Sequence, residues 1–378
     1  MKQRHPYVRR IAAVVVSVAL AWPGTAFADV LVDGTKLAEG PNSVGGGTAT
    51  YGSGSLGMEN VTANNVSTNE DLNVNFSGGN SVDTFQVTGD ANVNVSFSGE
   101  NNVEDVEAYG SSNVTVNLNG HNDTEDVEAY DNSTLTVNVT GENEVESIKG
   151  YGDADVTVQG TNCPRGDVVK VGDDESSERI GTERGNLVVK DVTVITESEQ
   201  DQVRSTGGNV SILCSKIKGG DSNKRTDITA AGTLFVGGSV IDVKGTMSSG
   251  GKMTIRRSDV DVARPDGDDS PYRVWSRTGI DIIEEKNGEV KKGKLGDTEV
   301  WYLKTDDDDA GDKVHLVSAL KPCYYGKCAN TGDDDSDSDN EEQRRWLPAT
   351  ADESVSVLPV VILGGLFVAL DIRRRMRA

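Results

Sequence analysis

A 21-residue repeat runs without insertion through the first half of the chain, and no other feature limits the possible folds so strongly. Each copy opens with apolar residues that alternate with Asn, Ser or Thr. Alternation with a period of two is typical of a β-strand buried on one face. A glycine and a second short strand follow. Because one copy is too short to bury its apolar face alone, the copies are expected to stack as a solenoid. The copies begin at Leu72, Val93, Val114, Leu135 and Val156.

Looser copies of the pattern extend to about residue 264, at intervals of 19 to 24 residues. The sequence therefore predicts an all-β fold, a right-handed parallel β-helix, with the hand taken from the rule for parallel crossovers. The 43 glycines suit the many turns of such a coil. The predicted parts are an N-terminal cap (29–71), regular repeats (72–161), irregular coils (162–264) and a small C-terminal β module that closes the open end (265–329).

The texture of these coils resembles the right-handed β-helix domains of secreted carbohydrate-binding proteins and of pectate-lyase-like proteins. The resemblance covers the solenoid and rests on the repeat pattern. It implies a protein that binds carbohydrate or, alternatively, an enzyme that degrades polysaccharide.

The first 28 residues have the pattern of a secretory signal peptide. Four basic residues precede a short apolar run, Ile11–Trp22, and Ala26 and Ala28 form the small-x-small pattern that a signal peptidase cleaves. The alternative is an N-terminal membrane anchor, but the run is shorter than the roughly 20 residues that span a bilayer. Export is therefore expected.

The other end of the chain carries a pentapeptide, Leu347-Pro348-Ala349-Thr350-Ala351, then an apolar stretch (355–370) and a basic tail. This order resembles the LPxTG sorting signal of Gram-positive surface proteins, from which it departs at Ala351. The resemblance implies that a sortase cuts after Thr350 and joins it to peptidoglycan, after the apolar stretch has paused in the membrane with its basic tail inside. The alternative is a plain single-pass anchor. Both place the protein outside the cell, and sorting places it on the cell wall.

The charge balance excludes whole classes of partner. The chain has 61 acidic and 37 basic residues, a net charge of −24, which argues against any nucleic-acid partner. Removal of the predicted signal peptide and sorting signal makes the remainder more acidic still. Residues 330–346 are so rich in acidic residues that they are expected to form a disordered spacer before the anchor.

Four cysteines in an exported chain indicate disulfide bonds. Cys323 and Cys328 flank a four-residue loop that one bridge closes easily, which leaves Cys163 to pair with Cys214. A zinc site is disfavoured because the whole chain has three histidines.

Stacked coils place equivalent residues about 4.8 Å apart, so each repeat position becomes a column of side chains. One column consists of asparagines and is expected to form a ladder of amide hydrogen bonds between coils. Its members are Asn80, Asn101, Asn122 and Asn143.

A second column consists of Tyr109, Tyr130 and Tyr151, with Glu107 and Glu128 beside it. These rings are expected to face outwards, where they can stack on the CH faces of sugars while the carboxylates accept hydrogen bonds from hydroxyl groups. The alternative is a purely structural ladder of ring contacts. The two interpretations stay open at this point.

A third column is acidic: Asp83, Glu104, Glu125 and Glu146. Stacked carboxylates repel one another, and a calcium ion with oxygen ligands would relieve that repulsion. The alternative is an acidic arc that is only solvated. Structural calcium is a hypothesis, and no other cofactor is indicated.

Carboxylates are so abundant that no pair of them stands out as a catalytic pair, so no catalytic residue is assigned. The sequence therefore predicts a wall-anchored, non-catalytic adhesin or stalk that binds a glycan or a host surface. The alternatives are a secreted lyase or glycosidase and a purely structural surface-coat protein.

Overall fold

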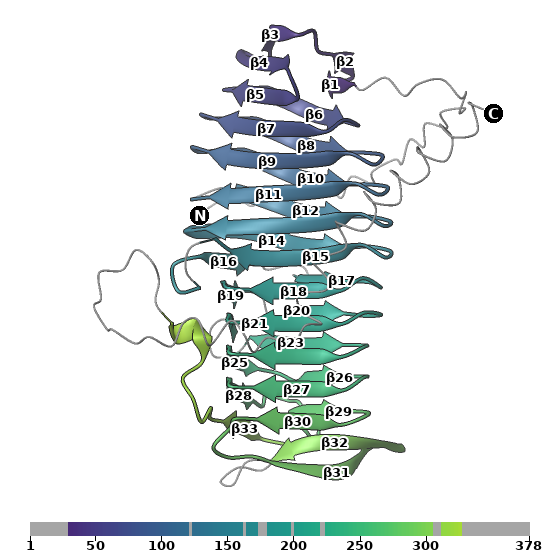
Figure 1. The fold of residues 1–378 in the computed structure, drawn as a ribbon, viewed down its shortest axis with the longest axis vertical. Helices are drawn as coiled ribbons and strands as arrows, with labels where there is room; N and C mark the ends of the chain where they lie inside the picture. The colour runs from purple at the N-terminus through teal and green to yellow at the C-terminus, as the bar shows by residue number, and fades with distance from the viewer. Residues whose placement is uncertain are drawn as a thin grey trace, which may run out of the picture.

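The computed structural model describes residues 29–120, 123–161, 164–172, 180–197, 200–219, 224–304 and 311–326. These residues form an all-β structure whose strands stack along one long axis (Figure 1). Most neighbouring strands run parallel and pair with the equivalent strand of the next coil. This confirms the predicted parallel β-helix.

The described strands form two sheets, which we name sheet A and sheet B. Sheet B contains β3 (Gly40–Val44), β4 (Gly47–Gly52), β5 (Ser55–Glu59), β7 (Leu72–Ser77), β9 (Asn92–Ser98), β11 (Asn113–Asn119), β13 (Thr134–Thr140), β15 (Asp155–Gly160), β18 (Leu187–Lys190), β21 (Val210–Leu213), β24 (Leu234–Gly237), β27 (Met253–Arg256) and β30 (Ile280–Ile283).

Sheet A contains β1 (Val30–Val32), β2 (Thr35–Lys36), β6 (Thr62–Thr68), β8 (Ser81–Val87), β10 (Asn102–Ala108), β12 (Asp123–Ala129), β14 (Glu142–Gly150), β16 (Val168–Val171), β17 (Ile180–Thr182), β19 (Thr193–Thr196), β20 (Gln200–Ser205), β22 (Lys216–Gly219), β23 (Arg225–Ala230), β25 (Val240–Lys244), β26 (Met247–Ser249), β28 (Asp259–Ala263), β29 (Val274–Ser276), β31 (Glu289–Leu295), β32 (Thr298–Lys304) and β33 (Lys313–Leu316).

The coils change from two strands to three where the strict repeat ends. In the regular half, each coil has one strand in each sheet. The nine-residue β14 then pairs with two shorter strands, β16 through its first half and β17 through its second half. Sheet A is therefore split into two columns of strands, β16 to β28 and β17 to β29, for the rest of the solenoid.

Alternation along the strands produces a narrow apolar core between the sheets. In β9, Val93, Val95 and Phe97 are buried while the residues between them point outwards. Phe97 stacks on Phe76 of the previous coil, with ring centroids 5.2 Å apart. Because every coil repeats this pattern, the core is a continuous column of Val, Ile, Leu and Phe along the whole stack.

Buried polar ladders line the turns between the sheets. The Asn80 Nδ2 group donates to Asn101 Oδ1 at 2.8 Å, and its Oδ1 atom accepts from the Val61 N–H at 2.9 Å. The predicted asparagine ladder is thus confirmed for these two rungs. Asn143 is also buried, while Asn122 lies outside the described residues.

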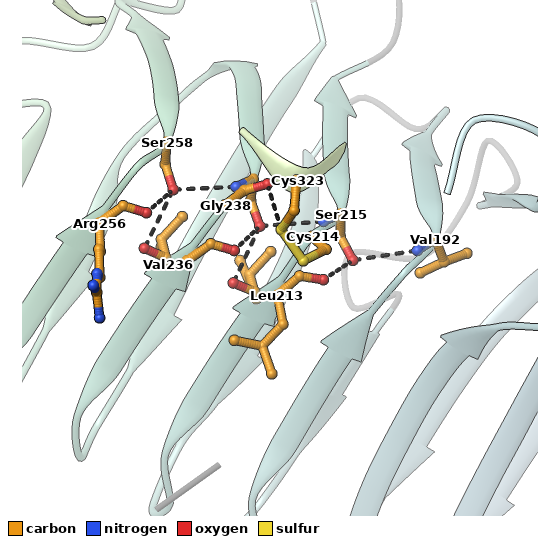
Figure 2. The surroundings of a disulfide bond; sticks show 12 residues. Val192, Leu213, Cys214, Ser215, Val236, Gly238, Arg256, Ser258 and Cys323 are labelled. Carbon is orange, nitrogen blue, oxygen red and sulfur yellow. Dashed lines mark hydrogen bonds between the residues drawn. A yellow bond between two sulfur atoms is a disulfide. The ribbon is translucent and has the colours of Figure 1, made fainter. Parts of the chain in front are cut away.

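A serine ladder takes over in the irregular coils. The Ser215 N–H donates to Ser239 Oγ, and the Ser239 N–H donates to Ser258 Oγ, both at 3.2 Å (Figure 2). Glu285 forms the last rung, because its Oε1 atom accepts from the Ser258 N–H at 3.0 Å. Burial raises the pKa of this carboxyl to about 7.

Antiparallel strands close both ends of the stack. At the N-terminal end, β3 and β4 precede β5 as a meander, and β1 pairs with β2 and β6. At the other end, β31 and β32 form a hairpin and β33 pairs with β28 (Figure 1). The strands β29 and β30, which fall in the predicted C-terminal module, are instead parallel members of the last coil.

After β33 the chain returns along the flank of the solenoid. The 3-10 helix η1 (Cys323–Tyr325) lies against earlier coils, where the Tyr324 N–H donates to the Gly238 carbonyl at 3.0 Å. A disulfide joins Cys323 to Cys214, at the end of β21 (Figure 2).

Both predicted cysteine pairs are therefore wrong. The first pair was predicted from closeness in sequence and the second by elimination. The observed bond instead joins two cysteines that are 109 residues apart. Cys163 and Cys328 lie outside the described residues, although their described neighbours approach each other: the Arg165 Nη2 group donates to the Gly326 carbonyl at 3.4 Å.

We expect Cys214→Ser to lower the free energy of unfolding by about 3–5 kcal/mol, because the disulfide closes a long loop in the unfolded chain. Thermal unfolding of the variant and of the parent measures this loss. Peptide mapping without reduction should recover a Cys214–Cys323 cross-link. Recovery of a Cys323–Cys328 peptide in its place would contradict the structure.

Candidate functional site

Sheet B presents an uncharged outer surface over four consecutive strands. Every side chain that points outwards from β7, β9, β11 and β13 is Asn, Ser or Thr. We name this surface the amide–hydroxyl face. Its members are Asn73, Asn75, Ser77, Asn92, Asn94, Ser96, Ser98, Asn113, Thr115, Asn117, Asn119, Thr134, Thr136, Asn138 and Thr140.

Hydrogen bonds between coils orient the amides of this face. The Asn117 Nδ2 group donates to Asn94 Oδ1 at 2.6 Å, and the Asn138 Nδ2 group donates to Asn117 Oδ1 at 2.8 Å. Each amide is therefore held in line and keeps further donor and acceptor capacity towards solvent. These residues carry no predicted role, although the polar half of the strand alternation marks their positions in the sequence.

A shallow groove of about 370 Å³ hollows the start of the amide–hydroxyl face. Gly57 of β5 pairs with Asn75 of β7, and because it has no side chain the column of outward residues is interrupted there. Ser55, Asn73 and Ser96 are among the polar residues that line the groove.

Over the same coils, the outer surface of sheet A carries many acidic side chains. Asp105 of β10 and Asp126 of β12 are in register, as are Glu107 and Glu128. Burial, followed by repulsion from Asp126 and Glu107, raises the pKa of Asp105 to about 7. Most of the acidic residues that lie on strands of the regular half are thus on sheet A, and Asp155 of β15 is an exception.

The predicted acidic column lies on this acidic side, at successive strands β8, β10, β12 and β14. Within the described residues, no group of three or more His, Cys, Asp or Glu side chains converges in a way that could hold a metal ion. Structural calcium stays a prediction. Its proposed ligands are Asp83, Glu104, Glu125 and Glu146.

The predicted tyrosine column is a stack of rings. The centroids of Tyr109 and Tyr130 are 4.5 Å apart with planes 4° from parallel, and those of Tyr130 and Tyr151 are 4.9 Å apart at 15°. Glu128 accepts hydrogen bonds from the hydroxyl groups of Tyr130 and Tyr151. Burial raises the pKa of all three phenols, that of Tyr109 to about 12, and it also raises the pKa of Glu128.

This geometry limits what the tyrosines can bind. The rings cover each other's inner faces, and the hydroxyl groups of Tyr130 and Tyr151 are engaged with Glu128. A sugar could therefore stack only at an end of the column. The equivalent positions beyond the ends are Thr88 before Tyr109 and Glu183 after Tyr151. The structural-ladder interpretation accounts for the interior of the stack.

A second groove, of about 190 Å³, lies at the Tyr151 end of the stack. It lies over β17, and its lining includes Lys149, Gly181 and Arg204. This groove was not predictable from the repeat, because these three residues are not separated by the 21-residue interval.

The predicted processing sites lie outside the described residues. These are Ala26 and Ala28 of the signal peptide and Leu347, Pro348, Ala349, Thr350 and Ala351 of the sorting signal. In the part of the chain that the structure describes, which ends at Gly326, no helix is long and apolar enough to cross a membrane.

We expect Tyr130→Ala to lower the free energy of unfolding by about 2–3 kcal/mol, since it removes two ring contacts and the buried ring area. Tyr109→Ala removes one ring contact and should cost about half as much. Chemical denaturation of both variants and the parent tests this order. Equal losses for the two variants would show that stacking contributes little.

Asp105 should make stability depend on pH. Its carboxyl titrates at about 7 in the folded protein and near 3.8 in the unfolded chain, so between these values the folded state binds more protons. The contribution of this group to stability therefore falls as pH rises from about 4 to 7.

We expect Asp105→Asn to raise the free energy of unfolding at pH 8 by about 1–2 kcal/mol, after allowance for solvent screening, and to change it little at pH 4. Asp90→Asn, which removes the same charge from an exposed turn, is the matched control. A gain for Asp105→Asn that is equal at pH 4 and pH 8 would exclude the proposed repulsion.

Comparison of the chain with protein-family models, with curated proteins and with solved structures finds no match. The fold is therefore established here by the strand pairing itself, and any function has to be argued from the surface of this chain.

Proposed function

We propose that the protein is a cell-wall-anchored surface adhesin that binds carbohydrate without cleaving it. The observation that carries this proposal is the amide–hydroxyl face, a regular uncharged surface on a chain with a net charge of −24. Glycans are rich in hydroxyl groups that both donate and accept hydrogen bonds. Amide and hydroxyl side chains can do the same.

The chemistry of the face supports binding without catalysis. Its outward side chains include no carboxylate, imidazole, thiol or amine. General acid–base catalysis and glycoside cleavage both need a titratable pair at the scissile bond. The face supplies only neutral hydrogen-bonding groups, in fixed positions set by the strands.

The path of the chain suggests a geometry for the proposed anchoring. The described chain ends at Gly326, beside Arg165, with η1 lying where the sheet B strands β21 and β24 end. Figure 1 shows η1 on the flank of the stack, away from both capped ends. The predicted acidic spacer and sorting signal follow from that point. The solenoid would be attached by its side, which differs from a stalk standing on one end.

A side attachment would leave the tyrosine stack facing away from the wall. The turns that carry the tyrosines join the end of sheet A strands to the beginning of β11, β13 and β15. The helix η1 lies at the opposite edge of the same sheet, beside the ends of its strands. The edge that points outwards would therefore hold the tyrosine stack, while the amide–hydroxyl face would lie between the two edges.

The test is a glycan array with the full chain purified in mild detergent, read for retention and for cleavage. Retention of neutral glycans without cleavage supports the adhesin. Release of shortened glycans would replace it with a polysaccharide-degrading enzyme, and the absence of retention would favour a structural coat.

The double variant Asn117→Asp with Asn138→Asp places two charges in the middle of the amide–hydroxyl face. We expect it to reduce retention of neutral glycans by about tenfold or more, because buried charges lose hydration without gaining a partner. The double variant Ser81→Asp with Asn102→Asp adds the same charge at exposed positions of sheet A and is the control. Equal retention by both double variants would move the site away from this face.

A further inference from the structure

One outward column of sheet B stays uncharged well beyond the amide–hydroxyl face. Strand pairing keeps its members in register from β5 to β27, and the next position, Asp281 of β30, pairs with Lys252. We name it the neutral column. Its members are Ser55, Asn73, Asn94, Thr115, Thr136, Thr157, Val188, Ser211, Phe235 and Thr254.

Phe235 gives the neutral column an aromatic ring that lies over the sheet. Its side chain points outwards from β24 and is partly exposed, while Leu234 and Val236 beside it are buried. A Cβ atom added to Gly237 would lie 2.5 Å from the Cε1 atom of Phe235 and 2.9 Å from its Cζ atom. The ring therefore reaches along the strand and covers the backbone of Gly237, instead of projecting into solvent.

Apolar contacts support the inner side of this ring. Leu213 is in register with Gly237 and is only 3% exposed, although it faces outwards from β21. The Leu213 Cδ2 atom also lies 3.6 Å from the Cβ position at Gly237 that the Phe235 ring overlaps. None of the ring-to-ring contacts among the described residues involves Phe235, so no second ring covers it. An aromatic ring in this position can stack on the CH face of a pyranose.

Hydroxyl groups lie on both sides of the ring. Ser211 precedes Phe235 in register and Thr254 follows it, each about 4.8 Å away along the axis. Both side chains are partly exposed, and no other residue in the described ranges engages either hydroxyl group. A pyranose that stacks on Phe235 presents its own hydroxyl groups at the rim of the ring. Ser211 and Thr254 can donate to these groups or accept from them.

The neutral column leads from Phe235 back to the amide–hydroxyl face. Four strand intervals separate β24 from β13, which is about 19 Å. The sheet B strands stack along the long axis of the molecule (Figure 1). The side chains between are Thr157, Val188 and Ser211, whose hydroxyl and methyl groups suit the hydroxyl and CH surfaces of a sugar chain. An extended glycan can therefore contact Phe235 and the amide–hydroxyl face together, whereas a coiled chain would leave the surface.

We infer that sheet B binds a linear, extended and neutral glycan lengthwise, with Phe235 as the aromatic subsite on which one pyranose stacks. This binding mode rests on the proposed carbohydrate-binding function, which it narrows to one class of glycan and extends to a second point of contact. An acidic glycan is disfavoured because the chain has a net charge of −24.

Calorimetric titration of the full chain in mild detergent with cellobiose, cellotetraose and cellohexaose tests this binding mode. These probes are neutral, extended chains of β-linked glucose. We expect cellohexaose to bind about tenfold or more tightly than cellobiose, because only the longer chain reaches both points of contact. Maltohexaose, which contains the same sugar in a coiled, α-linked chain, is the matched control and should bind about tenfold or more weakly than cellohexaose.

Three results of this titration would overturn the lengthwise mode. They are equal affinity for cellobiose and cellohexaose, equal affinity for cellohexaose and maltohexaose, and the absence of cellohexaose binding.

Phe235→Ala should weaken the binding of cellohexaose by about tenfold, since it removes the stacking surface. Phe235→Tyr keeps a ring and should bind as the parent does. Trp275→Ala removes an outward-facing ring from β29 of sheet A, and it should leave the affinity unchanged. Parental affinity in a folded Phe235→Ala variant would overturn the assignment of the subsite.

Gly237→Ala tests the position of the ring without removing it. The added Cβ atom would displace the tip of the Phe235 ring, and we expect binding of cellohexaose to fall by about fivefold. In the Phe235→Ala background, Gly237→Ala should have no further effect, because no ring is left to displace. Equal losses from Gly237→Ala in both backgrounds would show that Gly237 does not act through Phe235. This variant also keeps the test decisive if Phe235→Ala does not fold.

The two proposals fail in different ways. If Asn117→Asp with Asn138→Asp abolishes retention of neutral glycans while Phe235→Ala retains full affinity, only the Phe235 subsite is lost. If no neutral glycan is retained by the parent, the proposed function itself is lost.

Discussion

Backbone hydrogen bonds between coils hold each strand in register with its equivalent in the next coil, and the rest of the structure depends on this register. Val95 of β9, for example, pairs with Val74 before it and Val116 after it. A residue type that recurs in the repeat is thereby turned into a column of contacts. Apolar columns make the core, amide columns make ladders, and charged columns repel.

The register also explains why the two sides of the solenoid differ so strongly. On sheet A, burial and the Asp126 carboxylate in register with it raise the pKa of Asp105, which remains partly exposed to water. In the next coil, Ser147 follows Asp126 in its column and donates a hydrogen bond to it, and Lys149 follows Glu128. The repulsion between stacked carboxylates therefore ends at this coil. On sheet B the same spacing joins neutral amides by hydrogen bonds, so the stacking there is favourable.

The regular half of the molecule was predictable from the sequence, and the return of the chain was not. The alternation around Val93 and Phe97 predicted the strands, and the spacing of Asn80 and Asn101 predicted a buried ladder. The cysteine pairing failed because sequence proximity says nothing about a segment that folds back over several coils. The tyrosine column was predicted with two open interpretations, and its stacked rings agree with the ladder of ring contacts.

The sequence by itself determined the period, the residue types of each column and the charge of each side, because these follow from an unbroken interval of 21 residues. Only the tertiary structure decided the split of sheet A beyond β14, the Cys214–Cys323 bond and the groove at Gly181. Lys149 and Gly181 are 32 residues apart, and Gly181 and Arg204 are 23 apart. Where the repeat interval varies, strand pairing decides which residues of adjacent coils become neighbours. That pairing depends on how the whole stack packs.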